Sequence, residues 1–168
     1  LVRFVKLVTG ITFGPTDKNS EGGYISEANL VNNNESILDS AETGANIALN
    51  LPIQFTAEVK PGYEIEGWYV NNVRDEEAGN SETYSYPNTT SASSIYIAPK
   101  FRQVEYDITT GDNVTVNGQN RTTARGGESL TFTAVPPAGQ DVTGWTVNGE
   151  SVSGSGNTLV WTVANGYL

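Results

Sequence analysis

The sequence contains no cysteine, no histidine and no methionine among its 168 residues. Without cysteine there can be no disulfide, no cysteine-zinc site and no thiol nucleophile. Without histidine, the side chain most used as a general base and as a metal ligand is also missing. We therefore expect a protein that is not an enzyme, and we predict no catalytic, cofactor-binding or metal-binding residues.

The lack of methionine also bears on the start of the chain. Because no methionine is present, we expect that Leu1 is not a native start and that the chain is a fragment or a processed product. The apolar runs are only a few residues long, which excludes a membrane-spanning helix, and no segment is organised like a signal peptide. A cysteine-free chain rich in Thr, Ser, Asn and Gly fits a secreted bacterial surface module.

Basic residues are scarce: the chain has 9 of them against 19 acidic residues, giving a formal net charge of −10. Nucleic-acid binding depends on Lys and Arg that neutralise phosphates, so we expect no nucleic-acid partner. An anionic membrane surface is excluded for the same reason. The charge predicts a soluble, self-repelling surface. Attraction of cations such as Ca²⁺ is the alternative, but no acidic loop has the ligand spacing of an EF-hand.

What the chain does have is an internal repeat. Residues 55–86 align without a gap onto residues 132–163 at a constant offset of 77, with ten identities in 32 pairs. Chance would give roughly two at ordinary residue frequencies. Self-similarity at a fixed offset indicates one structural unit built twice. We therefore predict two modules, residues 1–103 with additional N-terminal strands and residues 104–168.

Alternating apolar and polar residues with many β-branched side chains predict a mainly β protein with little helix. Residues 130–134 alternate cleanly between apolar side chains and threonine. Asn148-Gly149 is a strong hairpin signal, and Asn71-Asn72 holds the same place in the first copy. We predict that each copy is a β-meander around a central tryptophan, with a short helix at 36–43 as a further possibility in the N-terminal part. Residues 95–101 read as a closing strand of the first copy.

The offset of 77 makes a further prediction about the second copy. The equivalent of Phe101 would be residue 178, but the chain ends at Leu168. The second copy should therefore lack a closing strand. An open sheet edge invites pairing with another chain, so we predict edge-to-edge self-association or fraying at 164–168.

The repeated motif resembles a known family. Residues 127–139 (Gly-Glu-Ser-Leu-Thr-Phe-Thr-Ala-Val-Pro-Pro-Ala-Gly), followed by Gly144-Trp145 and Val147-Asn148-Gly149, are similar to the divergent internalin-B-type B-repeat family. The first copy matches through Phe55-Thr56-Ala57, Pro61-Gly62-Tyr63, Ile65, Gly67-Trp68, Val70-Asn71, Tyr84 and Phe101. The resemblance covers roughly 47–101 and 111–163.

The resemblance implies small β-rich modules, in some relatives with a β-grasp-like sheet, on secreted or wall-anchored proteins of mostly Gram-positive bacteria. The role it implies is that of a stalk, spacer or adhesion module. Two departures stand out: Gln140 replaces the aromatic residue that the family prefers, and the first copy has more residues between Tyr24 and Phe55 than the second has between Val114 and Phe132.

The aromatic residues are the candidates for ligand binding. Trp68 and Trp145 are in phase with apolar neighbours, so we expect both in the core rather than stacked on a sugar. Tyr69 lies opposite Trp68 in the alternation and occurs in the first copy alone, which makes it the one candidate for binding a glycan. Tyr84 and Tyr86 should be buried or half-buried.

The carboxylates do not form a repeated constellation. The pair Glu64 and Glu66 should point outward from a strand, and Glu76-Glu77 should lie in a turn, so we expect solvated positions rather than a glycosidase pair. The second copy retains only Asp141 among these positions.

We thus expect a non-catalytic, extracellular repeat segment of a bacterial cell-surface, cell-wall or secreted protein, acting as a stalk, spacer or adhesin. The alternatives are a module that binds an unknown carbohydrate or protein, by outward aromatics or by strand addition at an open edge, and an accessory domain of a secreted hydrolase.

Overall fold

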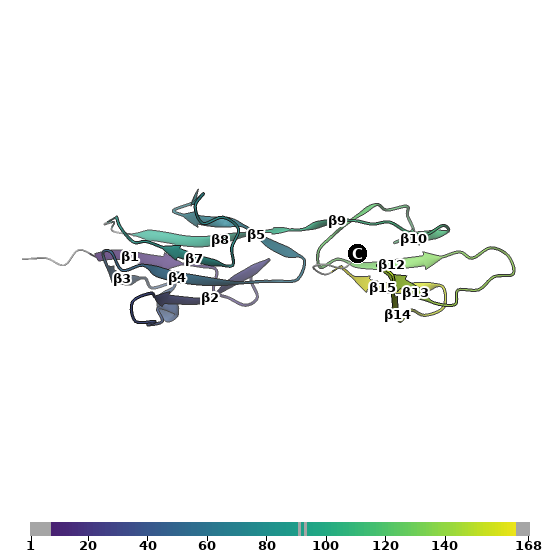
Figure 1. Ribbon diagram of the computed structural model, residues 1–168, viewed down its shortest axis with the longest axis horizontal. Helices are drawn as coiled ribbons and strands as arrows, with labels where there is room; N and C mark the ends of the chain where they lie inside the picture. The colour runs from purple at the N-terminus through teal and green to yellow at the C-terminus, as the bar shows by residue number, and fades with distance from the viewer. Residues whose placement is uncertain (1–7, 91, 93, 164–168) are drawn as a thin grey trace, which may run out of the picture. The chain divides into compact units, whose positions relative to one another are not determined.

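The computed structural model describes residues 8–90, 92 and 94–163. The chain divides into two compact units, one made of Leu1–Lys60 with Glu64–Arg102 and one of Pro61–Tyr63 with Gln103–Leu168. The expected mainly β fold is confirmed, since strands account for nearly all the regular structure (Figure 1). Among the described residues, the only helical element is a 3-10 turn, η1 (Leu38–Ser40), within the segment where a short helix was an option. No helix of the described residues has the length and apolar character needed to cross a membrane.

The first unit is built from two sheets. The larger has the strand order β3-β1-β8-β5-β6, with bounds β1 Val8–Phe13, β3 Ala45–Ala48, β5 Tyr63–Val70, β6 Val73–Arg74 and β8 Ile95–Gln103. The smaller has the order β2-β4-β7, with bounds β2 Gly23–Leu30, β4 Ile53–Val59 and β7 Thr83–Tyr86. Strand β8 runs parallel to β1, with Ile11 opposite Ile95.

The core of the first unit draws on both sheets. Side chains at alternate positions of β4 point inward, and Phe55 at its centre is fully buried. Phe55 meets Phe13 of the larger sheet edge-on, with ring centroids 5.2 Å apart, and Trp68 stacks on Tyr84 at 5.2 Å. Such aromatic pairs add to the stability gained by burial. Trp68 is therefore a core residue of the first unit, as expected.

Tyr84 and Tyr86 are buried, with 5% and 8% of their surface exposed, which confirms that prediction. The Tyr84 hydroxyl donates to Oδ2 of Asp75 at 2.7 Å. Burial raises the pKa of Tyr84, and the bond to Asp75 raises it further. The phenol is thus a neutral donor that ties β7 to the loop after β6.

The second unit contains three smaller sheets. A three-stranded sheet has the order β10-β12-β15, and two-stranded sheets pair β11 with β9 and β13 with β14. The bounds are β9 Glu105–Asp107, β10 Val114–Val116, β11 Thr123–Arg125, β12 Ser129–Ala134, β13 Trp145–Val147, β14 Glu150–Val152 and β15 Thr158–Thr162.

The two units share one topology. In chain order β9 to β15 take the places of β1 to β7, so that β10-β12-β15 reproduces β2-β4-β7 and the antiparallel pair β9/β11 reproduces β1/β3. The hairpin β13/β14 reproduces β5/β6. Among the described residues, no strand of the second unit takes the place of β8. The offset predicts that the second copy lacks a closing strand, and the described part of the second unit contains none. The predicted pairing or fraying of 164–168 concerns residues outside the described part.

The predicted β-meander is wrong. Strand β4 pairs with β2 and β7, whereas β5, which follows it in the chain, lies in the other sheet beside β6 and β8. Alternation along a strand reveals which face is buried, but not which strand lies alongside. Consecutive strands cross between sheets here because each sheet must cover the apolar face of the other.

The hairpin turns follow the prediction. Asn148 and Gly149 have φ values of 50° and 85° between the paired residues Val147 and Glu150. Asn71 and Asn72 have φ values of 50° and 65° in the first unit. Two successive positive φ angles define the tight hairpin turn whose twist matches that of the flanking strands.

The register of the last strand departs from the constant offset. Phe55 faces Tyr84 across β4 and β7, but its equivalent Phe132 faces Leu159 rather than Trp161. Trp161 therefore takes the place of Tyr86, and β15 is shifted by two residues. A shift of two keeps every side chain on its original face, so the sequence pattern does not reveal it.

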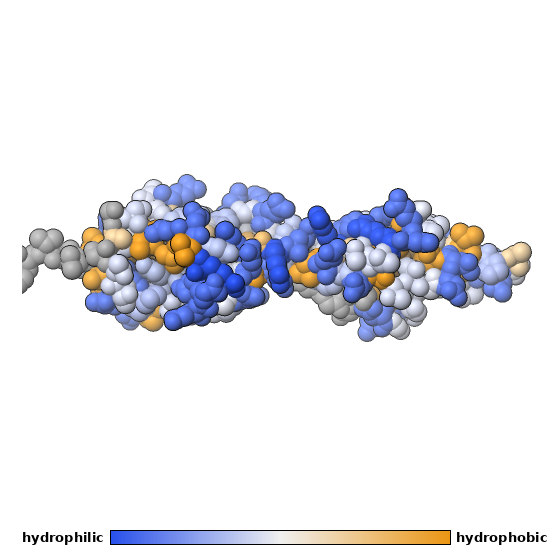
Figure 2. Space-filling view, turned by 90° about the horizontal axis from the view of Figure 1, so that it is seen from above, coloured by the Kyte–Doolittle hydropathy of each residue, from blue (hydrophilic) through white to orange (hydrophobic). Residues whose placement is uncertain are grey.

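Figure 2 shows a surface dominated by hydrophilic residues, with hydrophobic ones in small separate groups. Val31, Val73, Val135 and Val160 are among the exposed apolar side chains. Single exposed apolar residues of this kind are ordinary on soluble proteins.

Candidate functional site

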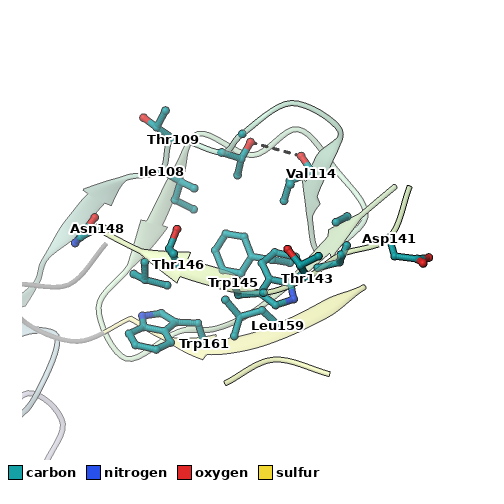
Figure 3. A pocket seen from close by; sticks show the side chains of 17 residues that line it. Ile108, Thr109, Val114, Asp141, Thr143, Trp145, Thr146, Asn148, Leu159 and Trp161 are labelled. Carbon is teal, nitrogen blue, oxygen red and sulfur yellow. Dashed lines mark hydrogen bonds between the residues drawn. The ribbon is translucent and has the colours of Figure 1, made fainter. Parts of the chain in front are cut away.

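The second unit carries a groove of about 450 Å³, lined by residues from the segment after β9 to β15. Ile108 and Val114 line one side of the groove, while Trp145, Leu159 and Trp161 line the other (Figure 3). The charged member of this lining is Asp141. The floor of the groove is thus apolar. Threonine hydroxyl groups, such as those of Thr109 and Thr143, lie in its lining as well.

The groove exposes a face that is covered in the first unit. Phe55 and Trp68 are both 0% exposed, whereas their equivalents Phe132 and Trp145 are partly exposed. The expectation that Trp145 is a core residue like Trp68 is therefore wrong. The physical reason is local: β8 lies between β1 and β5 in the first unit, and the described second unit has no strand there.

The two tryptophans of the groove differ in their hydrogen bonding. Nε1 of Trp145 donates to the Gly156 carbonyl at 3.0 Å, as Nε1 of Trp68 donates to the Ser81 carbonyl at 2.8 Å. Nε1 of Trp161 is shielded from solvent, yet it has no acceptor among the described residues. A buried donor without a partner costs roughly 1–3 kcal/mol, so such groups are rare in native proteins.

Tyr69, the candidate glycan-binding residue, lies on the side of β5 opposite Trp68 and is half-buried. Nζ of Lys100 sits 4.0 Å from the centre of its ring, and its hydroxyl donates to Oε1 of Glu66 at 3.2 Å. Partial desolvation and the nearby Glu66 raise the pKa of Tyr69. The ammonium group occupies one ring face, so a sugar could stack there only after displacing Lys100. A role of Tyr69 in binding stays a prediction.

The carboxylates of the first unit have structural partners. Glu64 pairs with the guanidinium of Arg102 on β8, and Arg74 lies 3.6 Å from Glu76. Glu66 is exposed and accepts the Tyr69 hydroxyl, as described above. In the part of the chain that the structure describes, no group of three or more acidic side chains is placed to hold a metal ion. The structure does not bring these carboxylates together into one constellation.

One ion pair of the second unit is well formed. Both amino nitrogens of Arg121 reach the carboxylate of Glu128, with Nη2 and Oε2 2.7 Å apart. This contact lowers the pKa of Glu128, helped by the backbone N–H of Arg125. The pair lies in a separate hollow from the apolar groove. It serves to join β11 to the start of β12.

The sequence predicts only part of what forms the apolar groove. The offset of 77 pointed to a lacking strand, but alternation placed Trp145 in the core. The same comparison contained a usable signal: the residues that lie beside β8 in the first unit have no corresponding strand beside them in the described part of the second.

The two units define the class of protein to which the chain belongs. It is a tandem array of small β modules with a common topology. Within it, residues 104–166 match the family model of the divergent InlB B-repeat domain. This confirms, for the second unit, the resemblance to that family. Neither the curated proteins nor the solved structures that were compared gave a significant match.

Proposed function

We propose that the chain is a non-catalytic repeat segment of a bacterial cell-surface or secreted protein, acting outside the cell as a stalk or spacer or as an adhesion module. The observation that carries this proposal is the repetition of one topology in series, β1 to β7 and then β9 to β15. Repetition of a unit extends a chain without creating a new site. The family match of residues 104–166 supports a surface role.

The join between the units adds support. Strand β8 ends at Gln103 and β9 begins at Glu105, so a single residue, Val104, separates them. A linker rich in Gly and Ser would let the units tumble freely. A spacer benefits instead from a stiff connection between its units. The sequence at this join contains no linker rich in Gly and Ser.

Solution scattering tests the spacer role. A compact globule of 168 residues would have a radius of gyration of about 15 Å. A spacer requires a clearly larger value that stays constant with protein concentration. A radius near that of a compact globule would count against the spacer role.

Location is tested separately. Protease treatment of intact bacteria producing the parent protein should remove an epitope placed in this chain while sparing a cytoplasmic marker. Protection of the epitope until the cells are lysed would contradict the proposed extracellular position.

A binding role is the second candidate, and a specific observation favours it. In the part of the chain that the structure describes, the groove of the second unit leaves Phe132 and Trp145 partly exposed, and Nε1 of Trp161 has no acceptor. These features suit a protein ligand better than a sugar, since a strand can supply both apolar side chains and backbone hydrogen bonds.

A further inference from the structure

We propose that Asn148 is a site of spontaneous deamidation, where the side-chain amide reacts with the backbone nitrogen of Gly149 and is lost as ammonia. This modification goes beyond the proposed surface role and does not depend on it. Three turns of the chain have nearly the same backbone but hold their asparagine side chains differently. Asn71, Asn117 and Asn148 begin these turns, with φ values of 50°, 51° and 50°.

The reaction needs only the turn itself, base and water. The backbone nitrogen of Gly149, after losing its proton to base, attacks Cγ of Asn148. A bond forms between these two atoms, the Cγ–Nδ2 bond breaks, and Nδ2 leaves as ammonia. Water then opens the resulting succinimide ring at either carbonyl, which leaves aspartate or its isomer isoaspartate. Each event adds a negative charge to the turn.

Glycine at the second position of a turn leaves the attacking nitrogen open. A Cβ built on Gly149 would meet no atom within 4 Å beyond its chain neighbours, and the same is true of Gly118 after Asn117. Both Asn-Gly pairs are exposed to solvent. In the first unit Asn71 is followed by Asn72, whose side chain crowds the nitrogen where glycine allows close approach. The dipeptide alone therefore makes Asn117 and Asn148 equal candidates.

Hydrogen bonds to a neighbouring strand separate the two candidates. Oδ1 of Asn117 accepts the N–H of Thr131 at 2.8 Å, and the N–H of Asn117 donates to the carbonyl of Thr131 at 2.8 Å. Asn71 makes the same two bonds with Tyr96, each also 2.8 Å long. We call this pair of bonds the asparagine clamp. Closing the succinimide ring requires the asparagine to rotate out of its left-handed conformation, which a clamped asparagine can do only after both bonds break.

The side chain of Asn148 makes no hydrogen bond within the described residues. Its turn joins β13 and β14, a hairpin with three paired residues on each strand. A short exposed hairpin opens locally more often than a turn bonded to the central strand of a sheet, such as β12 between β10 and β15. A strand supplied to Asn148 from elsewhere would protect it as the clamp does, so the test uses the chain of 168 residues alone.

The test compares the rates of deamidation at the two sites in the folded chain. We expect Asn148 to react about tenfold faster than Asn117, because two more hydrogen bonds must break at Asn117. After incubation in mildly alkaline buffer, cleavage after glutamate places Asn117 in fragment 106–128 and Asn148 in fragment 129–150. The pair Asn165-Gly166, outside the described residues, falls in fragment 151–168.

Mass spectrometry of each fragment over time gives the rate, and fragment ions assign it to a residue. The control is the same chain in denaturant, where neither turn exists. There the two Asn-Gly pairs should react at equal rates.

Two variants exchange the second turn residue between the units. Gly149→Asn gives the second unit the Asn-Asn sequence of the first, and it should remove most of the deamidation in fragment 129–150. Asn72→Gly places glycine after Asn71 while the clamp of Asn71 to Tyr96 stays in place. Asn71 should then react about as slowly as Asn117. Unfolding curves check that both variants are folded.

Three results would overturn the proposal. One is an equal rate at Asn117 and Asn148 in the folded chain. Another is an Asn71 that reacts as fast in Asn72→Gly as Asn148 does in the unaltered chain, since the dipeptide rather than the clamp would then decide. A third is a folded chain that keeps the amide of Asn148 while the denatured chain loses it.

Discussion

At the scale of single residues, Trp68 and Trp145 show how the same side chain at the same motif position takes two roles. Both donate a ring N–H to a backbone carbonyl in the loop after the hairpin, which leads to β7 in the first unit and to β15 in the second. Trp68 is fully buried, whereas Trp145 is partly exposed in the groove. The motif thus fixes the orientation of the indole, while its burial depends on what covers it.

Alanine substitution should separate these roles. Trp68→Ala removes a large buried ring and should lower the free energy of unfolding of the first unit by roughly 3–5 kcal/mol. Trp145→Ala should cost the second unit less than half of that, because part of the ring surface is already in water. Chemical denaturation of each variant measures both values. Equal costs would mean that Trp145 is as well covered as Trp68.

The Arg121–Glu128 pair predicts a pH dependence. The pKa of Glu128 lies below its usual value when folded, so its contribution to stability is present above the usual carboxylate pKa of about 4.3. That contribution is lost as pH falls through the lower folded value. Glu128→Gln should therefore be less stable than the unaltered chain at pH 7, and the difference should shrink on acidification. Thermal unfolding at several pH values measures it, and a difference independent of pH would contradict the assignment.

At the scale of elements, the hairpins are the features that the sequence predicted best. Asn71-Asn72 and Asn148-Gly149 place positive φ angles between short paired strands. Local chemistry is enough here, since asparagine and glycine tolerate the left-handed region better than other residues. The strand β8 illustrates the opposite case: its sequence predicts a strand, but not that it runs parallel to β1 and beside β5.

The turn chemistry yields a prediction for Asn72, whose φ is 65°. Asn72→Ala should destabilise the first unit by about 1 kcal/mol, because a Cβ without a compensating polar group is unfavourable in the left-handed region. Asn72→Gly should not destabilise it, since glycine occupies the same place at position 149 of the second unit. Denaturation curves of the two variants distinguish these outcomes. An alanine variant as stable as the glycine variant would show that the turn is not under this constraint.

At the scale of the whole molecule, the two units have separate cores of different size. Among the described residues, the cluster of the first unit contains seventeen buried residues and that of the second contains five, with no residue shared. A smaller core buries less apolar surface and is more marginal. The second unit is therefore expected to be the less stable of the two.

Calorimetry should resolve two unfolding transitions, the second unit melting at the lower temperature. Ile97 of β8 is fully buried in the first unit. Ile97→Ala should lower only the upper transition, by a loss of roughly 2–5 kcal/mol in that unit. If the variant shifts both transitions equally, the units fold as one cooperative body.

The sequence by itself determined the strands, the inward faces, the two hairpin turns and the duplication of one unit, because these depend on alternation and on residues close together in the chain. Only the tertiary structure decided that β4 and β5 lie in different sheets, that β15 is shifted by two residues, and that Trp145 lines a groove. These features depend on which strands meet, and any shift by an even number of residues leaves the alternation unchanged. The burial of a side chain also depends on strands distant in the chain. Strand β8 (Ile95–Gln103) lies beside the strand that carries Trp68, and no corresponding strand lies beside that of Trp145 among the described residues.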